Sequence, residues 1–170
     1  ASRCASPEVL SALNNKETVH ARAEELGIPV PKQYDRKPDR YPVIIKPHCG
    51  EKFGLKASER YVIAASEAAY PAKLASMQVY DPHPIVQDCV QGDGIGVCLL
   101  LGREGELLSA LCHRRIREYP TSGGPSTCCV SFYDKELIES AYHLLKSFRF
   151  TGIAMVEFKG SSLLEVNPRI

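Results

Sequence analysis

Three oxygen-bearing side chains interrupt the apolar stretch at the end of the chain. Glu157 breaks the run GIAMVEFK, and Glu165 and Asn167 break the run LLEVNP. Residues two apart on a strand share a face, so Glu165 and Asn167 point the same way. Carboxylate and amide oxygens from few residues, with other positions left for water and phosphate, suit Mg²⁺ bridging a nucleotide better than a closed calcium site.

The three side chains converge only if the two runs form a hairpin in the right register. A three-residue loop, residues 160–162, places Glu157 directly opposite Glu165, whereas a two-residue loop sends the two carboxylates to opposite faces. Directly opposed carboxylates repel one another unless a cation lies between them. The alternative is a pair of exposed carboxylates on a solvated strand face, which is common in half-exposed sheets.

Basic residues near strand and helix ends are candidates for binding an anion. Lys46 closes the apolar run YPVIIKP, where it either meets a phosphate or extends its ammonium into water. Lys16 begins a capped helix, whose free N–H groups favour an anion, although such a lysine is usually solvent-facing. In HRRIRE, His113, Arg115 and Arg117 share one strand face. These arginines favour a phosphoryl or carboxylate partner over nucleic acid, because interleaved aromatic residues and a basic surplus are missing.

The helices that would position these side chains carry clear start and stop signals. We expect a helix in NNKETVHARAEELGIPVP, with Asn14 or Asn15 as its N-cap and Gly27 as its stop. Asp134 is the N-cap of a second helix in YDKELIESAYHLLKSFRF, whose apolar residues form one stripe. A third helix begins or bends near Pro71.

The strands do not alternate regularly with these helices. We expect strands in YPVIIKP, RYVIAA and PIVQDCV, a hairpin joined at residues 102–105, and the C-terminal hairpin. Hairpins dominate the second half of the chain. The pattern therefore predicts an α+β fold in two lobes, residues 1–88 and residues 89–170.

Composition narrows the class of protein. Lys and Arg total 21 against 20 acidic residues, so no global field attracts nucleic acid or anionic lipid. No apolar run approaches the roughly 20 residues that span a bilayer. Seven cysteines without C-x-x-C spacing fit free thiols in a reducing compartment. We expect a cytoplasmic protein without a nucleic-acid or membrane partner, and a homodimer remains open.

In their order, the motifs resemble the ATP-grasp superfamily, and within it the carbamoyl phosphate synthetase-like carboxylate-amine ligases. The matching stretches cover almost the whole chain: NNKETVHARAEELGIPVP, YPVIIKP, PIVQDCVQGDG, HRRIREYPTSGGPST, TGIAMVEFK and LLEVNPR. The resemblance implies two α+β lobes with mainly antiparallel sheets that enclose a nucleotide cleft. It also implies a covering loop in HCGEKFGLK, which lacks the dense Gly-Ser pattern of relatives.

The resemblance also implies roles for individual residues. Lys16 and Lys46 resemble the residues that contact phosphate, and Glu157, Glu165 and Asn167 resemble ligands of Mg²⁺, or of Mn²⁺ in its place. The linker resembles one that hydrogen-bonds adenine through its backbone, and it comprises Gln87, Asp88, Cys89 and Val90. Arg117 and Arg169 resemble the residues that face the γ-phosphate and the acyl phosphate.

The activity that the resemblance implies is an Mg-ATP-dependent ligase, or the core fragment of one. It would activate a small-molecule carboxylate as an acyl phosphate for attack by an amine or a similar nucleophile. Relatives carry a further α/β domain before this region and further elements after the Asn-Pro-Arg motif, so we expect a truncated form. A module that binds ATP or a phosphorylated metabolite without catalysis is the alternative, and a plain structural domain is a third.

Overall fold

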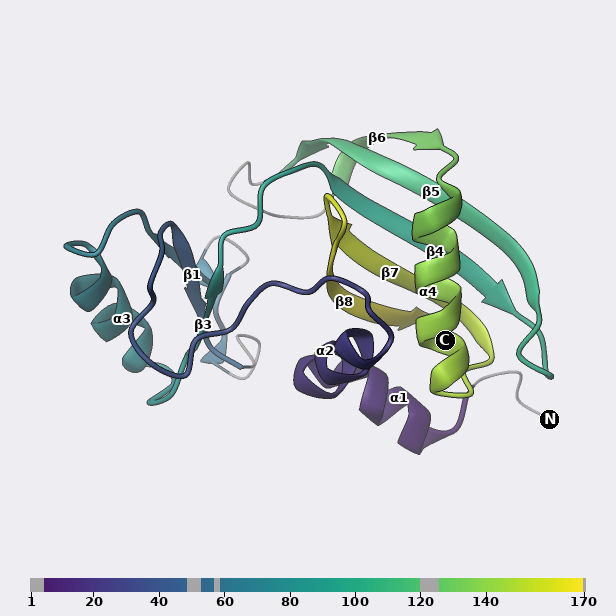
Figure 1. The fold of residues 1–170 in the computed structure, drawn as a ribbon, viewed down its shortest axis with the longest axis horizontal. Helices are drawn as coiled ribbons and strands as arrows, with labels where there is room; N and C mark the ends of the chain where they lie inside the picture. Colours follow the sequence, from purple (N-terminus) through teal and green to yellow (C-terminus); the bar gives the residue numbers. More distant parts are fainter. Residues whose placement is uncertain (1–4, 49–52, 57–58, 120–125, 170) are drawn as a thin grey trace. The chain divides into compact units, whose positions relative to one another are not determined.

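Four helices and eight strands form in the part of the chain that the computed structural model describes, which is residues 5–48, 53–56, 59–119 and 126–169 (Figure 1). The helices are α1 (Pro7–Asn14), α2 (Lys16–Glu25), α3 (Tyr70–Gln78) and α4 (Lys135–Ser147). The strands are β1 (Val43–Lys46), β2 (Val62–Ala64), β3 (Ile85–Asp88), β4 (Gly94–Leu101), β5 (Leu107–Glu118), β6 (Ser126–Phe132), β7 (Gly152–Lys159) and β8 (Ser162–Arg169). The predicted α+β class is confirmed.

The strands divide into two sheets. One has three strands in the order β2-β1-β3, and the other has five in the order β6-β5-β4-β7-β8. β1 runs antiparallel to both of its neighbours, and so do β4 with β5 and β7, and β7 with β8. The hairpins expected at β4–β5 and at β7–β8 are therefore confirmed.

The chain forms two compact units that are not continuous in sequence. Unit 1 comprises Ala1–Val30, Gln91–Ile116 and Cys128–Ile170, and unit 2 comprises Pro31–Val90 and Arg117–Thr127. The chain passes from unit 2 to unit 1 between Val90 and Gln91. Within unit 1, α1 and α2 pack on β8, which groups the first thirty residues with the C-terminal part of the chain.

The core of unit 1 lies on one face of the five-stranded sheet. Alternate residues of β4 and β7 are fully buried there, among them Val97, Leu99 and Val156. α4 lies across this face and contributes Leu144 and Leu145, which are also fully buried (Figure 1). α1 and α2 complete the core at the β8 end. The opposite face of the sheet carries Glu157 of β7 beside partly exposed apolar residues of β4 and β7.

Unit 2 has a smaller core of its own. Val43 and Ile45 of β1 are fully buried and pack with Ala64 of β2 and with Tyr70 and Met77 of α3. α3 begins at Tyr70 with a proline in its first turn, as the sequence predicted.

None of the described helices is long and apolar enough to span a bilayer.

The predicted N-caps form, and one helix was not predicted. Asn15 accepts a hydrogen bond from Thr18 N at 3.1 Å, and Asp134 Oδ1 accepts one from Leu137 N at 3.1 Å. The unpredicted helix is α1, although Ser6 followed by Pro7 is a recognisable start signal. The Ser6 hydroxyl accepts from Val9 N at 3.4 Å, which caps α1 in the same way.

Candidate functional site

The β7–β8 hairpin places two carboxylates directly opposite each other. Glu157 of β7 pairs with Glu165 of β8, as predicted, but Lys159 pairs with Ser162, so the loop has two residues and not three. A regular hairpin with this loop would put Glu157 and Glu165 on opposite faces. A register shift between Glu157 and Phe158 corrects the mismatch, because Leu164 is inserted as an extra residue in β8.

The hydrophobic pattern of β8 explains this bulge. Leu163 and Val166 are both buried in the core, although residues three apart on a regular strand face opposite sides. Only an extra residue between them lets both reach the core. The same insertion turns Glu165 and Asn167 to the opposite face, beside Glu157, so burial of two apolar side chains positions the acidic ones.

Cations and an amide surround the two carboxylates. Lys16 Nζ lies 2.7 Å from Glu165 Oε2, and an Arg115 terminal nitrogen lies 2.5 Å from Glu157 Oε2. Asn167 Nδ2 donates to Glu157 Oε1 at 2.9 Å and to Glu165 Oε1 at 3.2 Å. The Arg115 and Glu157 side chains are only 19% and 15% exposed, so their charges interact with little screening by solvent.

Gly96 of β4 lies between the strands that carry Arg115 and Glu157. His113 and Glu157 both pair with Gly96, one on each side of β4. The His113 ring covers Gly96 so closely that a Cβ at Gly96 would lie 2.2 Å from Cε1. Burial, with a smaller effect of the Arg115 charge, lowers the pKa of His113, which favours the neutral ring in this row.

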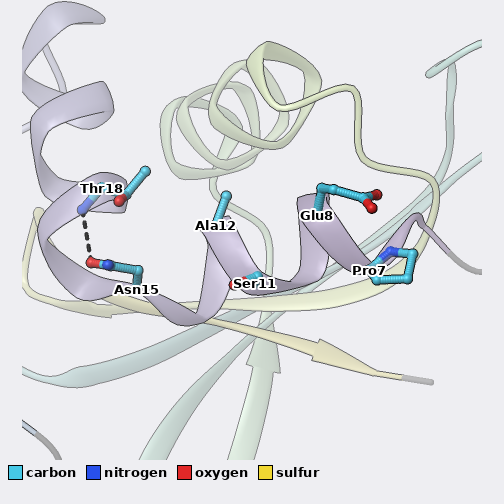
Figure 2. Close-up of a pocket in the computed structure, with 6 residues that line it drawn as sticks. All are labelled: Pro7, Glu8, Ser11, Ala12, Asn15 and Thr18. Carbon is cyan, nitrogen blue, oxygen red and sulfur yellow. Dashed lines mark hydrogen bonds between the residues drawn. The ribbon is translucent and has the colours of Figure 1, made fainter.

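Lys16 is positioned by the start of α2. The Asn15 cap fixes the first turn of the helix, and Lys16 is its first residue. Figure 2 shows this cap beside a surface hollow lined by α1 and the start of α2. The hollow is lined by Pro7, Glu8, Ser11, Ala12, Asn15 and Thr18, none of which is a predicted site residue.

The remaining predicted cationic residues are less fully described. Lys46 ends β1 as predicted, is half-buried and pairs with Ile85. Arg117 is exposed on β5, two residues after Arg115, and its carbonyl accepts a hydrogen bond from Thr127 Oγ1 at 3.3 Å. The backbone of Arg169 pairs with Ile153, while its side chain lies outside the described part of the chain. Much of the predicted covering loop, residues 49–52, lies outside it too.

The predicted adenine linker runs along β3 in unit 2. Gln87 is 5% exposed, and its backbone pairs with Ile44 on one side and with Gln33 on the other. The N–H groups of Asp88 and Cys89 donate to Lys32 O at 2.9 Å and to Pro42 O at 3.2 Å. An adenine contact at Asp88 or Cys89 would therefore use their carbonyls.

A local polar cluster holds the end of this linker. Asp88 Oδ1 accepts from the Tyr34 hydroxyl at 2.7 Å and from Arg40 Nε at 3.0 Å, and Arg40 also forms an ion pair with the second carboxylate oxygen. Burial and the hydrogen bond to Asp88 raise the pKa of Tyr34, so its hydroxyl stays a donor. Val90 follows directly after this cluster at the edge of unit 2.

The donors of the β7–β8 hairpin can be tested against a divalent cation. Within the described residues, no group of three or more His, Cys, Asp or Glu side chains could hold a metal ion. The hairpin instead offers two carboxylates and one amide, a set of oxygen donors that fits Mg²⁺ with water and phosphate as further ligands. Asn167 now presents its nitrogen to both glutamates, so it would have to rotate by half a turn to present its oxygen.

The sequence did not indicate the contact of Arg115 with Glu157 or that of His20 with Leu164. Arg115 was grouped with Arg117 on a basic strand face, but the partner that it reaches depends on the register across three strands. His20 Nε2 lies 2.9 Å from the carbonyl oxygen of Leu164, the inserted residue of β8. The spacing of Lys16 and His20, one helical turn apart, was the available signal.

A family model and many solved structures match this chain. A family model described as an ATP-grasp domain matches residues 13–170. No curated protein sequence matches the chain. Similar solved structures include the D-alanine–D-alanine ligase of Bacillus anthracis complexed with ATP, with a TM-score of 0.63, 13% identity, and coverage of 94% of this chain and 57% of that chain.

Two other structures extend this comparison. The biotin carboxylase complex with β-γ-ATP from Campylobacter jejuni has a TM-score of 0.67 and 15% identity, and the match covers 98% of this chain and 43% of that chain. An ADP complex of N5-carboxyaminoimidazole ribonucleotide synthetase has a TM-score of 0.68 and 19% identity, with 95% and 46% covered. At such identities the likeness shows the fold alone, and the chain spans about half the length of these structures.

Proposed function

The chain belongs to the ATP-grasp domain family, and from this membership we propose that it performs Mg-ATP-dependent activation of a carboxylate, as a ligase or as the core of one. The carboxylate oxygen attacks the γ-phosphorus of ATP and ADP leaves. An amine, or a similar nucleophile, then attacks the acyl carbon of the mixed anhydride and phosphate leaves. Two easier steps thereby replace one difficult condensation.

One observation carries the proposal. Glu157 and Glu165 lie opposite each other on the same face of a sheet, and Asn167 donates a hydrogen bond to each of them. Opposed carboxylates are unfavourable in a sheet without compensating charge. Here Lys16 and Arg115 provide that charge. An arrangement that concentrates acidic oxygens and surrounds them with cations suits the binding of a metal–phosphate complex, in which both signs of charge are present.

The proposed roles follow from this arrangement and from the family. Glu157, Glu165 and Asn167 hold Mg²⁺, which when bound neutralises charge on the phosphates. Lys16 and Lys46 bind phosphate oxygens, and Arg117 and Arg169 stabilise the charge on the transferred phosphoryl group. The backbone of the linker formed by Gln87, Asp88, Cys89 and Val90 hydrogen-bonds adenine, through the carbonyls at Asp88 and Cys89.

A binding and turnover assay on this chain tests the proposal. Thermal unfolding is measured with ATP in the presence of Mg²⁺, Mn²⁺ or EDTA, and ADP release is measured with a panel of amino acids and small carboxylates. At a hundredfold excess over Kd, binding should add about 2.7 kcal/mol to the free energy of unfolding. Metal-dependent binding without ADP release would identify a non-catalytic nucleotide-binding module, and no stabilisation by Mg-ATP would refute the proposal.

Lys46→Ala separates the phosphate role from general nucleotide binding. Loss of the ammonium should weaken ATP binding and leave adenosine binding nearly unchanged, because adenosine has no phosphate. Equal losses for both ligands would contradict the role of Lys46. Lys135→Ala, on the exposed side of α4, is the matched control.

A further inference from the structure

The bulge in β8 decides whether the two carboxylates meet, and its inserted residue contacts a helix. Leu164 has no partner in β7, because Glu165 pairs with Glu157 and Leu163 pairs with Phe158. Its carbonyl oxygen lies 2.9 Å from His20 Nε2 in α2. An inserted residue loses its place in the ladder of backbone hydrogen bonds, and this contact supplies its carbonyl with a donor.

The direction of this hydrogen bond defines the protonation of one ring nitrogen. A carbonyl oxygen only accepts hydrogen bonds, so Nε2 of His20 carries a proton. The neutral Nε2–H tautomer and the imidazolium ion both satisfy this condition. The contact therefore persists in either charge state of the ring.

One face of α2 holds two consecutive residues of β8. Lys16 and His20 are four residues apart and lie on the same side of the helix. Lys16 pairs with the Glu165 side chain at 2.7 Å, while His20 binds the backbone of the residue before it. The helix itself is anchored by Val19 and Ala23, which are fully buried in the core of unit 1. α2 is thus a fixed support against which the bulge is held.

We propose that His20 is a positioning residue for the metal site: by donating to Leu164 O, it keeps the bulge in the form that holds Glu165 opposite Glu157. The metal-binding part of this inference rests on the proposed function, whereas the register part does not. A group that orients a ligand without touching the metal commonly affects metal affinity by about 10–100-fold.

Three variants of His20 test the donor and its reach. His20→Gln carries an amide N–H at about the position of Nε2, His20→Asn carries the same group too short to reach Leu164, and His20→Ala removes it. Mn²⁺ affinity is measured by electron paramagnetic resonance without nucleotide, and cross-strand NOEs between residues 157 and 165 report the register. His143→Ala, an exposed histidine on α4, is the matched control.

We expect Mn²⁺ to bind about tenfold more weakly to His20→Ala and His20→Asn, with weakened NOEs, while His20→Gln and His143→Ala stay close to the wild type. Wild-type affinity and NOEs in the Ala and Asn variants would overturn the proposal, as would equal losses for Gln and Asn. Should His20→Ala not fold, the Gln and Asn pair decides. If the wild type binds no Mn²⁺, the metal function fails, and the NOEs alone decide whether His20 positions Glu165.

Discussion

The two compact units each hold a polar cluster, and the clusters differ in the number of carboxylates and in the elements that supply their partners. In unit 1, the β7–β8 hairpin brings two carboxylates face to face, and their cations come from β5 and α2. In unit 2, the single carboxylate of Asp88 meets Arg40 and Tyr34, which come from the segment just before β1. In both clusters each carboxylate meets a cation. The second cluster mainly fixes the backbone of β3. The first also brings two like charges face to face, and it is the cluster that we propose as the ligand site.

The largest effect is expected for Glu165→Gln, which tests whether the unit 1 cluster binds a metal ion. The variant removes one charge required by a divalent cation but not by the core, so Mg²⁺-dependent ATP affinity should fall by at least about 100-fold while the fold remains. Calorimetric titration with and without Mg²⁺ measures the change. Glu139→Gln, an exposed glutamate on α4, is the control. Unchanged affinity would mean that the unit 1 cluster is structural as well.

Gly96→Ala tests the close packing of the His113 ring on β4, next to the unit 1 cluster. The new Cβ would lie 2.2 Å from the His113 ring and force it to move, at a cost of about 1–3 kcal/mol in the free energy of unfolding. Urea unfolding measures this cost. In a His113→Ala background the same substitution should cost much less, because the ring is gone. Equal costs in both backgrounds would exclude the ring as the cause.

Asp81→Asn tests whether a carboxylate of unit 2 stabilises the fold through its charge. The backbone N–H and ring of His48, with the backbone N–H of His83, donate to it and lower its pKa to about 2. A lowered native pKa stabilises the fold above the unfolded value of about 3.9, and this stabilisation is lost as the pH falls toward 2. Asp81→Asn should therefore cost about 1–2 kcal/mol at neutral pH and progressively less between about pH 4 and pH 2.

The measurement for Asp81 is urea unfolding of both proteins across this pH range. Asp35→Asn, at an exposed aspartate of the same unit, is the control. A stability difference for Asp81 that does not change with pH would show that the carboxylate contributes through packing and not through its charge.

The smallest effect is expected for Arg40→Ala. The Arg40 side chain is 62% exposed, so removing its ion pair with Asp88 should lower the free energy of unfolding only slightly. Adenosine binding should weaken slightly, because the end of β3 is less firmly held, and the Mg²⁺ dependence of ATP binding should not change. Arg36→Ala is the exposed control. A change in Mg²⁺ dependence would remove the functional distinction between the clusters.

Much of the fold was accessible from local patterns. The Asn15 and Asp134 caps, the buried strand that ends at Lys46 and the two hairpins follow from propensity and from hydrophobic alternation. α1 was missed because its amphipathic pattern is short, although Ser6 and Pro7 mark its start. The grouping of α1 and α2 with β8 could not be predicted, because it depends on which distant apolar faces pack together.

In the candidate site, too, local patterns predicted some features, and others depend on distant parts of the chain. Alternation within GIAMVEFK and LLEVNPR identified Glu157, Glu165 and Asn167 as neighbours on one face, and the structure brings them together. The loop length could not be predicted, because a two-residue turn followed by a bulge gives the same pairing at Glu157 as a three-residue turn. Arg115 and His20 were not identified, since their contacts cross β4 or reach from α2 to β8.

Residue types and their spacing were enough to predict which side chains could serve as oxygen donors and cations, and which faces of the strands had to be apolar. These properties depend on residue type and on the two-residue period of a strand, both of which are local. The tertiary structure decided the register, through the burial of Leu163 and Val166 against helices that lie more than a hundred residues away in the chain. It also decided which cations face Glu157 and Glu165, because charges from separate elements meet only after the core has packed.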